Sequence, residues 1–136
     1  MSAEPVMQLY ERFNERDLDG VLALLTDDFV LEDVALGLRF DGPDGFREWL
    51  APFLSAMPDA STEVTLVVDG GDWVATEHTG RGTHTGPLPT PQGEVPASGH
   101  SVELKFGEFF QLRDDKVAAL RAYWDSASLM RQIGAA

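Results

Sequence analysis

The sequence changes its hydrophobic period once, near Ser61, and this change constrains the fold more than any other feature. Before Ser61 the apolar residues recur at helical spacing, with Val6, Leu9, Tyr10 and Phe13 at positions i, i+3, i+4 and i+7. After Ser61 apolar and polar residues alternate, which is the pattern of half-buried strands. Helices that precede a set of neighbouring strands predict the α+β class.

Three helices are predicted before this change of period. Asp17 can cap the second of them, and a strand should follow at residues 29–34. Pro52 should kink the third helix, and Pro58 should end it. The predicted helices each carry one apolar stripe, so we expect them to pack on one side of a sheet.

Four strands are predicted after the change, at about residues 62–68, 72–84, 99–112 and 116–124. The first pair and the last pair are joined by short turn-forming segments, which predicts two antiparallel hairpins. Residues 85–99, between the middle strands, hold four prolines and three glycines, a composition that argues against regular structure. This segment is either a lid over a pocket or an inert connection.

Composition bounds the class of protein. The 136 residues favour one domain, residues 1–136, and the net charge of −13 disfavours nucleic acid and acidic membranes as partners. Without cysteine, thiol catalysis, disulfides and cysteine-bound metals are excluded. Glu4 and Glu11 interrupt the early apolar stretch, so neither a signal peptide nor a membrane helix fits. A cytoplasmic location is therefore expected.

Glu108 is the most informative acidic residue. It shares a predicted strand face with Phe106 and Phe110, where an ionised carboxylate would lose its water without obvious compensation. Desolvation should favour the neutral acid and make Glu108 a candidate proton donor. Alternatively, Glu108 lies at a sheet edge or pairs with Arg121 or Arg81.

Two further acidic positions are candidates for acid or base chemistry. Asp125 stands between the last strand and a final short helix, so it could cap that helix. It shares strand parity with Arg121 and Tyr123, so it could equally face a cavity. In the early strand, either Glu32 or Asp33 must lie on the buried side because successive side chains alternate.

The histidines do not form a metal site. His78 and His84 lie on one predicted strand, roughly 20 Å apart if the strand is straight, too far to share an ion. His100 is isolated, which is more typical of a surface residue. Neither a metal-binding spacing, a nucleotide-binding loop nor a serine-hydrolase motif is present. We therefore expect no metal and no cofactor.

Three segments, in this order along the chain, resemble the nuclear-transport-factor-2-like superfamily, in particular its SnoaL-like branch of polyketide and ester cyclases. They are LLTDDFVLED at residues 24–33, HTGRGTHTGPL at 78–88 and KVAALRAYWDSASLMRQIG at 116–134. The resemblance implies a curved antiparallel sheet that forms a cone-shaped barrel around a pocket, with three N-terminal helices packed on it. It does not determine the reaction, because one fold hosts many functions.

The resemblance also implies roles for individual residues. In the cyclases, an acidic residue before the terminal helix is the general acid/base of an intramolecular aldol closure, and Asp125 matches it. The cyclases often have histidine where this chain has Glu108. In the ketosteroid isomerases of the same superfamily, Tyr10 matches the tyrosine of the oxyanion hole, Asp33 the base, and Glu108 an aspartic acid kept neutral by apolar surroundings. Val34 stands where a proline usually follows that base.

Three functions follow from these resemblances. The first is a cofactor-independent cyclase acting on a hydrophobic, polyketide-like carbonyl compound, and the second is a proton-shifting isomerase; the third is a module that binds a small ligand without catalysis. In the enzymes, Asp125 or Asp33 would be the base, with Tyr10 and Glu108 as donors. The residues expected to contact substrate are Trp49, Phe53, His78, His84, Phe106 and Trp124. A homodimer is expected, since open sheet faces of this kind usually pair.

Overall fold

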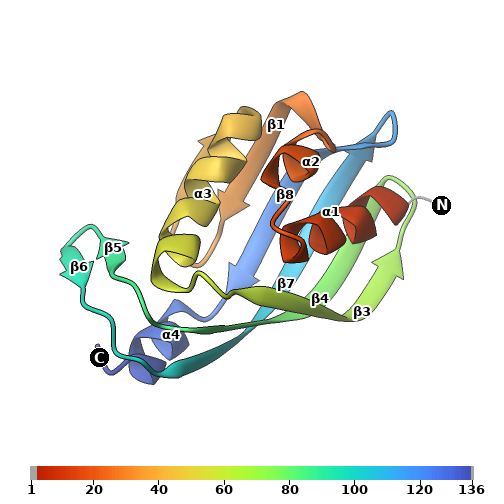
Figure 1. Ribbon diagram of the computed structural model, residues 1–136. Helices are drawn as coiled ribbons and strands as arrows, with labels where there is room; N and C mark the ends of the chain where they lie inside the picture. Colours follow the sequence, from red (N-terminus) through yellow and green to blue (C-terminus); the bar gives the residue numbers. More distant parts are fainter. Residues whose placement is uncertain (1–2, 136) are drawn as a thin grey trace.

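The computed structural model describes residues 3–135, which form a curved six-stranded sheet with helices on one face (Figure 1). The helices are α1 (Glu4–Asn14), α2 (Leu18–Leu22), α3 (Gly42–Ala56) and α4 (Ser126–Gln132). The strands are β1 (Leu25–Asp33), β2 (Leu38–Asp41), β3 (Ser61–Asp69), β4 (Trp73–Thr83), β5 (Leu88–Thr90), β6 (Gly93–Val95), β7 (Ser101–Arg113) and β8 (Lys116–Trp124). The α+β class is confirmed.

The helices form where the sequence predicts them. The apolar stripe of α1 is buried, and the Asp17 side chain accepts a hydrogen bond of 2.9 Å from the backbone N–H of Gly20 at the start of α2. Helix α3 begins with Pro43 in its first turn, continues through Pro52 and ends at Ala56, ahead of Pro58. Each helix thus presents apolar side chains to the sheet.

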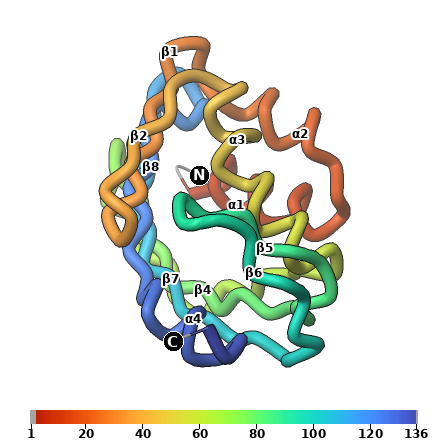
Figure 2. Tube along the Cα trace, turned by 90° about the vertical axis from the view of Figure 1, so that its left-hand side faces the viewer, coloured from red at the N-terminus to blue at the C-terminus, as the bar shows by residue number. Residues whose placement is uncertain are grey.

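The sheet has the strand order β2-β1-β8-β7-β4-β3. The pairs β3/β4 and β7/β8 are antiparallel hairpins, as predicted. Asp114 and Asp115 form the tight β7–β8 connection with φ angles of 54° and 61°, which a two-residue hairpin turn requires. Figure 2 shows the curvature of the sheet around the side that holds α1 and α3.

Two details of the predicted sheet are wrong. The sheet is mixed rather than antiparallel, because β1 lies parallel to β8, with Asp33 opposite Ala122. It is also open rather than a closed barrel, since β2 and β3 are edge strands. The β1–β8 pairing joins segments about ninety residues apart in sequence, and local alternation carries no information on such a partner.

The segment of residues 85–99, called the flap below, is partly regular, which corrects the prediction of an irregular loop. It contains the two-stranded hairpin β5–β6. Leu88 is buried in an apolar cluster with Met57, Val102 and Phe106. Of the four prolines, only Pro89 lies in a strand of the hairpin, and it is accommodated because each strand of an isolated pair keeps one unpaired edge.

A larger apolar core joins α1, α2 and α3 to the inner face of β1, β4, β7 and β8, and includes the fully buried Phe29 and Phe110. Within residues 3–135, no helix combines the length and apolar character needed to cross a membrane.

Candidate functional site

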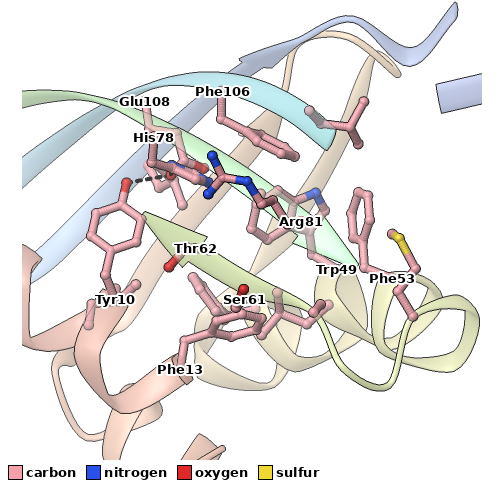
Figure 3. Close-up of a pocket in the computed structure, with 18 of the residues that line it drawn as sticks. Tyr10, Phe13, Trp49, Phe53, Ser61, Thr62, His78, Arg81, Phe106 and Glu108 are labelled. Carbon is pink, nitrogen blue, oxygen red and sulfur yellow. Dashed lines mark hydrogen bonds and ion pairs between the residues drawn. The ribbon is translucent and has the colours of Figure 1, made fainter. Parts of the chain in front are cut away.

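A cavity of about 90 Å³ lies between the helices and the inner face of the sheet. Helix α1 contributes Tyr10 and Phe13, helix α3 contributes Trp49 and Phe53, and β7 contributes Phe106, among others (Figure 3). The other lining residues are mostly aliphatic or aromatic and come from the same elements, from β3, β4 and β8, and from the α3–β3 connection: Leu9, Phe46, Leu50, Met57, Ala60, Ser61, Thr62, His78, Gly80, Arg81, Val102, Leu104, Glu108 and Leu120. An apolar ligand would therefore find complementary walls.

A buried polar cluster contributes Tyr10, His78 and Glu108 to the lining of this cavity. The Tyr10 hydroxyl donates a hydrogen bond of 2.6 Å to Glu108 Oε1 and lies 2.7 Å from Thr76 Oγ1. His78 Nδ1 lies 3.2 Å from the same Glu108 oxygen, close enough for an ion pair although not aligned as a hydrogen bond. The backbone pairing Thr76↔Glu108 and the alternation along β4 bring these side chains to one face.

Glu108 therefore sits among inward-facing groups. It is 3% exposed, and its partners are Tyr10 and His78 rather than Arg121 or Arg81. Arg121 lies over the ring of Trp73 on the other face of the sheet, while Arg81 pairs with two exposed glutamates. The buried setting expected for Glu108 is confirmed.

Burial and the neighbouring carboxylate set the acidity of Tyr10. Desolvation is the largest cause, and the charge and the hydrogen bond of Glu108 act in the same direction. Together they raise the pKa of Tyr10 well above its ordinary value of 10.0. The phenol therefore stays neutral at physiological pH, and its hydroxyl donates a hydrogen bond to Glu108.

Aromatic rings fix the position of His78. Its imidazole is stacked on Phe106, with ring centroids 4.8 Å apart and an angle of 4°, and it meets the Tyr10 ring at 4.9 Å. Phe106 in turn stacks on Trp124, and Phe53 packs edge-on against both. His78 is thus held rigidly at the junction of the aromatic wall and the polar cluster.

Of the two neighbouring acids on β1, Asp33 is the buried one and Glu32 is exposed. Both carboxylate oxygens of Asp33 accept hydrogen bonds. The indole N–H of Trp49 donates to Oδ2 at 2.8 Å, the indole N–H of Trp124 lies 3.1 Å from both oxygens, and the backbone N–H of Leu36 donates to Oδ1. Asp33 does not line the cavity; it links β1, α3 and β8. Trp124 also does not line the cavity; it packs against Phe53 and Phe106, which do.

Asp125 and His84 also lie away from the cavity. Asp125 caps α4 by accepting a hydrogen bond from the backbone N–H of Ser128, and its side chain is 65% exposed. His84 is buried just after β4, where Nδ1 contacts the Ser98 hydroxyl at 2.8 Å and accepts from the Ser98 backbone N–H. Of the four predicted catalytic residues, the structure thus brings only Tyr10 and Glu108 together.

Sequence reasoning missed Thr76 as the third partner of this cluster. Its position two residues before His78, on the same face of the strand, was the available signal. In the part of the chain that the structure describes, His, Asp and Glu form no group of three placed to hold a metal ion.

Comparison with known proteins identifies the family. Residues 4–133 match the family described as SnoaL-like polyketide cyclase, so the chain belongs to that family. Among curated proteins, none matches the sequence significantly.

Solved structures with this fold include relatives from several bacteria. IdmH of Streptomyces antibioticus, a candidate polyketide cyclase, is 25% identical with a TM-score of 0.83, over 98% of this chain and 99% of IdmH. A candidate SnoaL-like cyclase from Jannaschia sp. CCS1 is 23% identical with a TM-score of 0.86, over 99% and 92%. A Catenulispora acidiphila protein with a ketosteroid isomerase-like fold, in complex with trimethylamine, is 18% identical with a TM-score of 0.78, over 96% and 92%.

Proposed function

We propose that this protein is a cofactor-independent enzyme that moves protons on a hydrophobic carbonyl compound, as expected of a SnoaL-like cyclase. The observation that carries the proposal is the hydrogen bond of 2.6 Å between Tyr10 and Glu108 in the lining of an apolar cavity. A carboxylate held in a water-poor site, beside walls that bind apolar compounds, can take a proton from a carbon next to a carbonyl group.

Glu108 is the proton-transfer group in this proposal. The base expected at Asp125 or Asp33 is reassigned, because Asp125 is exposed at a helix cap and Asp33 has both oxygens engaged by N–H donors. Glu108 lines the cavity and makes no hydrogen bond through Oε2 to any residue in the range 3–135. Tyr10 fixes the carboxyl group through its hydrogen bond to Oε1.

The cavity favours a compact substrate. Pockets that enclose drug-sized ligands usually measure about 300–1,000 Å³, whereas this cavity measures about 90 Å³. A single ring or a short chain with one carbonyl group suits that space. A polycyclic compound would require the flap or the helices to move.

Cyclisation and isomerisation share the first step in this proposal and differ in what the enol does next. In an intramolecular aldol closure the enol carbon attacks a second carbonyl carbon of the same molecule, whereas in an isomerisation the proton returns to another carbon. Membership of the cyclase family favours the closure. The product of an identified substrate distinguishes the two.

Proton exchange on a simple ketone tests the shared step. In deuterated water, the protein should accelerate exchange of the protons next to the carbonyl group of cyclohexanone, a compact apolar ring ketone, as followed by NMR. Glu108→Gln should lower that acceleration by about 10²–10⁴-fold, the usual contribution of a general base. Glu32→Gln, at an exposed glutamate on β1, is the matched control and should keep the full rate.

A non-catalytic binding module is the competing hypothesis. It predicts that cyclohexanone binds without exchange above the rate in buffer, or that Glu108→Gln exchanges as fast as the parent protein. Either result contradicts the proposed function.

A further inference from the structure

His78 lines the cavity, and its Nδ1 is a buried nitrogen without a hydrogen-bond partner among residues 3–135. The Tyr10 hydroxyl has one proton, and this proton is donated to Glu108. At the contact of 2.7 Å between Tyr10 and Thr76, the threonine must therefore be the donor, which commits its proton as well.

Two other residues that line the cavity also donate hydrogen bonds through N–H groups. The indole N–H of Trp49 donates to Asp33, and the Arg81 guanidinium donates to Glu63 and Glu103. His78 makes no hydrogen bond within residues 3–135, although Nδ1 lies 3.2 Å from Glu108 Oε1.

The position of the ring determines which nitrogen can meet a ligand. Nδ1 is buried against Glu108, and the ring plane is fixed by the stack on Phe106. Nε2 is the remaining ring nitrogen of a residue that lines the cavity. A proton on Nδ1 faces the Glu108 carboxylate, and a ring that is protonated on both nitrogens also carries an N–H at Nε2.

From this geometry we infer that His78 is a second catalytic residue, which donates a proton from Nε2 to the carbonyl oxygen of the substrate while Glu108 takes a proton from the neighbouring carbon. This inference rests on the proposed function. It explains how one compact cluster supplies both the acid and the base of an enolisation.

The proton balance closes within the cluster. Glu108 starts as the carboxylate and His78 as the imidazolium. The C–H proton passes to Glu108, the C–H electron pair forms the carbon–carbon double bond, and the carbonyl oxygen takes the proton from Nε2. The products are the enol, neutral Glu108 and neutral His78. In the second step the enol oxygen returns its proton to Nε2, and Glu108 gives its proton to the oxygen of the second carbonyl group in a closure, or to another carbon in an isomerisation, which restores the starting pair.

Binding of a phenolate tests the proposed donor to oxygen, His78, separately from the proposed base, Glu108. The probe is 4-nitrophenolate, whose oxygen carries the charge of an enolate but which has no proton for Glu108 to remove. His78→Phe keeps a flat ring for the stack on Phe106 and removes the N–H. Loss of a hydrogen bond to a charged oxygen should weaken binding of the probe by roughly 10–100-fold. His78→Gln, which retains an N–H donor, should restore part of that affinity.

His100→Phe, at an exposed histidine bonded to the backbone of Gln132, is the matched control and should bind the probe like the parent. In the unaltered protein, nitrogen NMR should show that the probe shifts the Nε2 signal of His78 but not the signals of His84 and His100. This measurement does not depend on whether any variant folds.

Equal probe affinity of the parent and a folded His78→Phe protein, or an unshifted His78 Nε2 signal with probe bound, would overturn the inference. The role of Glu108 in ketone exchange would be unaffected by that result. Conversely, loss of the proposed function would appear as ketone exchange that does not depend on Glu108, so the two failures are distinguishable.

Discussion

At the scale of single residues, two buried acids that were both predicted to be catalytic prove to have different surroundings. Asp33 receives N–H donors from Trp49, Trp124 and the backbone of Leu36, whereas Glu108 receives one hydroxyl and faces a histidine. A carboxylate whose oxygens are fully engaged links structural elements. One with a free oxygen beside a cavity is placed for chemistry.

The first prediction concerns Asp33. Asp33→Asn should lower the free energy of unfolding by about 2–4 kcal/mol, because the amide presents N–H groups to indole N–H donors and leaves buried donors unsatisfied. Urea denaturation measures the loss, and Glu32→Gln should change stability by less than about 0.5 kcal/mol. The folded variant should retain ketone exchange within a few-fold. A loss as large as that of Glu108→Gln would instead assign the base to Asp33.

The second prediction concerns Tyr10. Its pKa is raised in the folded protein, so its contribution to stability is fully present below the unfolded value of about 10 and is lost as the pH rises through the folded value. Ultraviolet absorbance, with Tyr10→Phe as the reference, should show Tyr10 ionising well above its ordinary pKa of 10.0. Tyr10→Phe should be less stable at neutral pH and lose less stability in alkali. Ionisation of Tyr10 at its ordinary pKa of 10.0 would contradict this assignment.

At the scale of elements, the flap depends on a close approach of two backbones. A Cβ atom on Gly86 would lie 2.0 Å from the carbonyl oxygen of Ser55, and the backbone N–H groups of Thr85 and Gly86 both donate to the carbonyl of Ala56. At its other end, the flap is fixed by the bonds between His84 and Ser98. The flap is therefore attached to the end of α3, beside the cavity.

The third prediction follows from this attachment. Gly86→Ala should displace the flap from α3 and cost about 1–3 kcal/mol of stability through overpacking. Hydrogen exchange in residues 85–99 should rise, and cyclohexanone exchange should change with it if the flap controls access to the cavity. Gly107→Ala is the matched control, because a Cβ there meets no atom within 4 Å. Unchanged protection of the flap in Gly86→Ala would contradict the attachment.

At the scale of the whole molecule, the outer face of the sheet carries an exposed apolar patch. Its members are large side chains on β3, β7 and β8 and at the start of β4: Leu66, Val68, Trp73, Phe109 and Tyr123. Phe109 and Tyr123 contact each other at 5.8 Å between ring centroids. Exposed patches of this kind mark interaction surfaces, so we propose this face for the homodimer expected from the sequence.

The fourth prediction tests that face. Phe109→Glu should shift the protein toward the monomer by placing a charge at the centre of a self-complementary contact. Sedimentation velocity at several concentrations measures the equilibrium. Met7→Glu, at a similarly exposed apolar residue on α1, should leave it unchanged. A parent protein that is monomeric at high micromolar concentration would contradict the proposal.

The sequence alone predicted the elements because their signals are local. The helical stripe of α1, the cap at Asp17, the two hairpins and the bounds of β8 follow from spacing and turn chemistry over a few residues. The burial of Glu108 followed from its apolar neighbours on one strand face. These features require no knowledge of distant partners.

Only the tertiary structure decided which side chains meet. The parallel pairing of β1 with β8, the hydrogen bond between Tyr10 and Glu108, and the two indoles on Asp33 join residues separated by long stretches of chain. A local pattern predicts the face on which a residue lies, but not the group opposite it. The partner is fixed by the packing of whole elements, and it is the partner that separates a structural carboxylate from a reactive one.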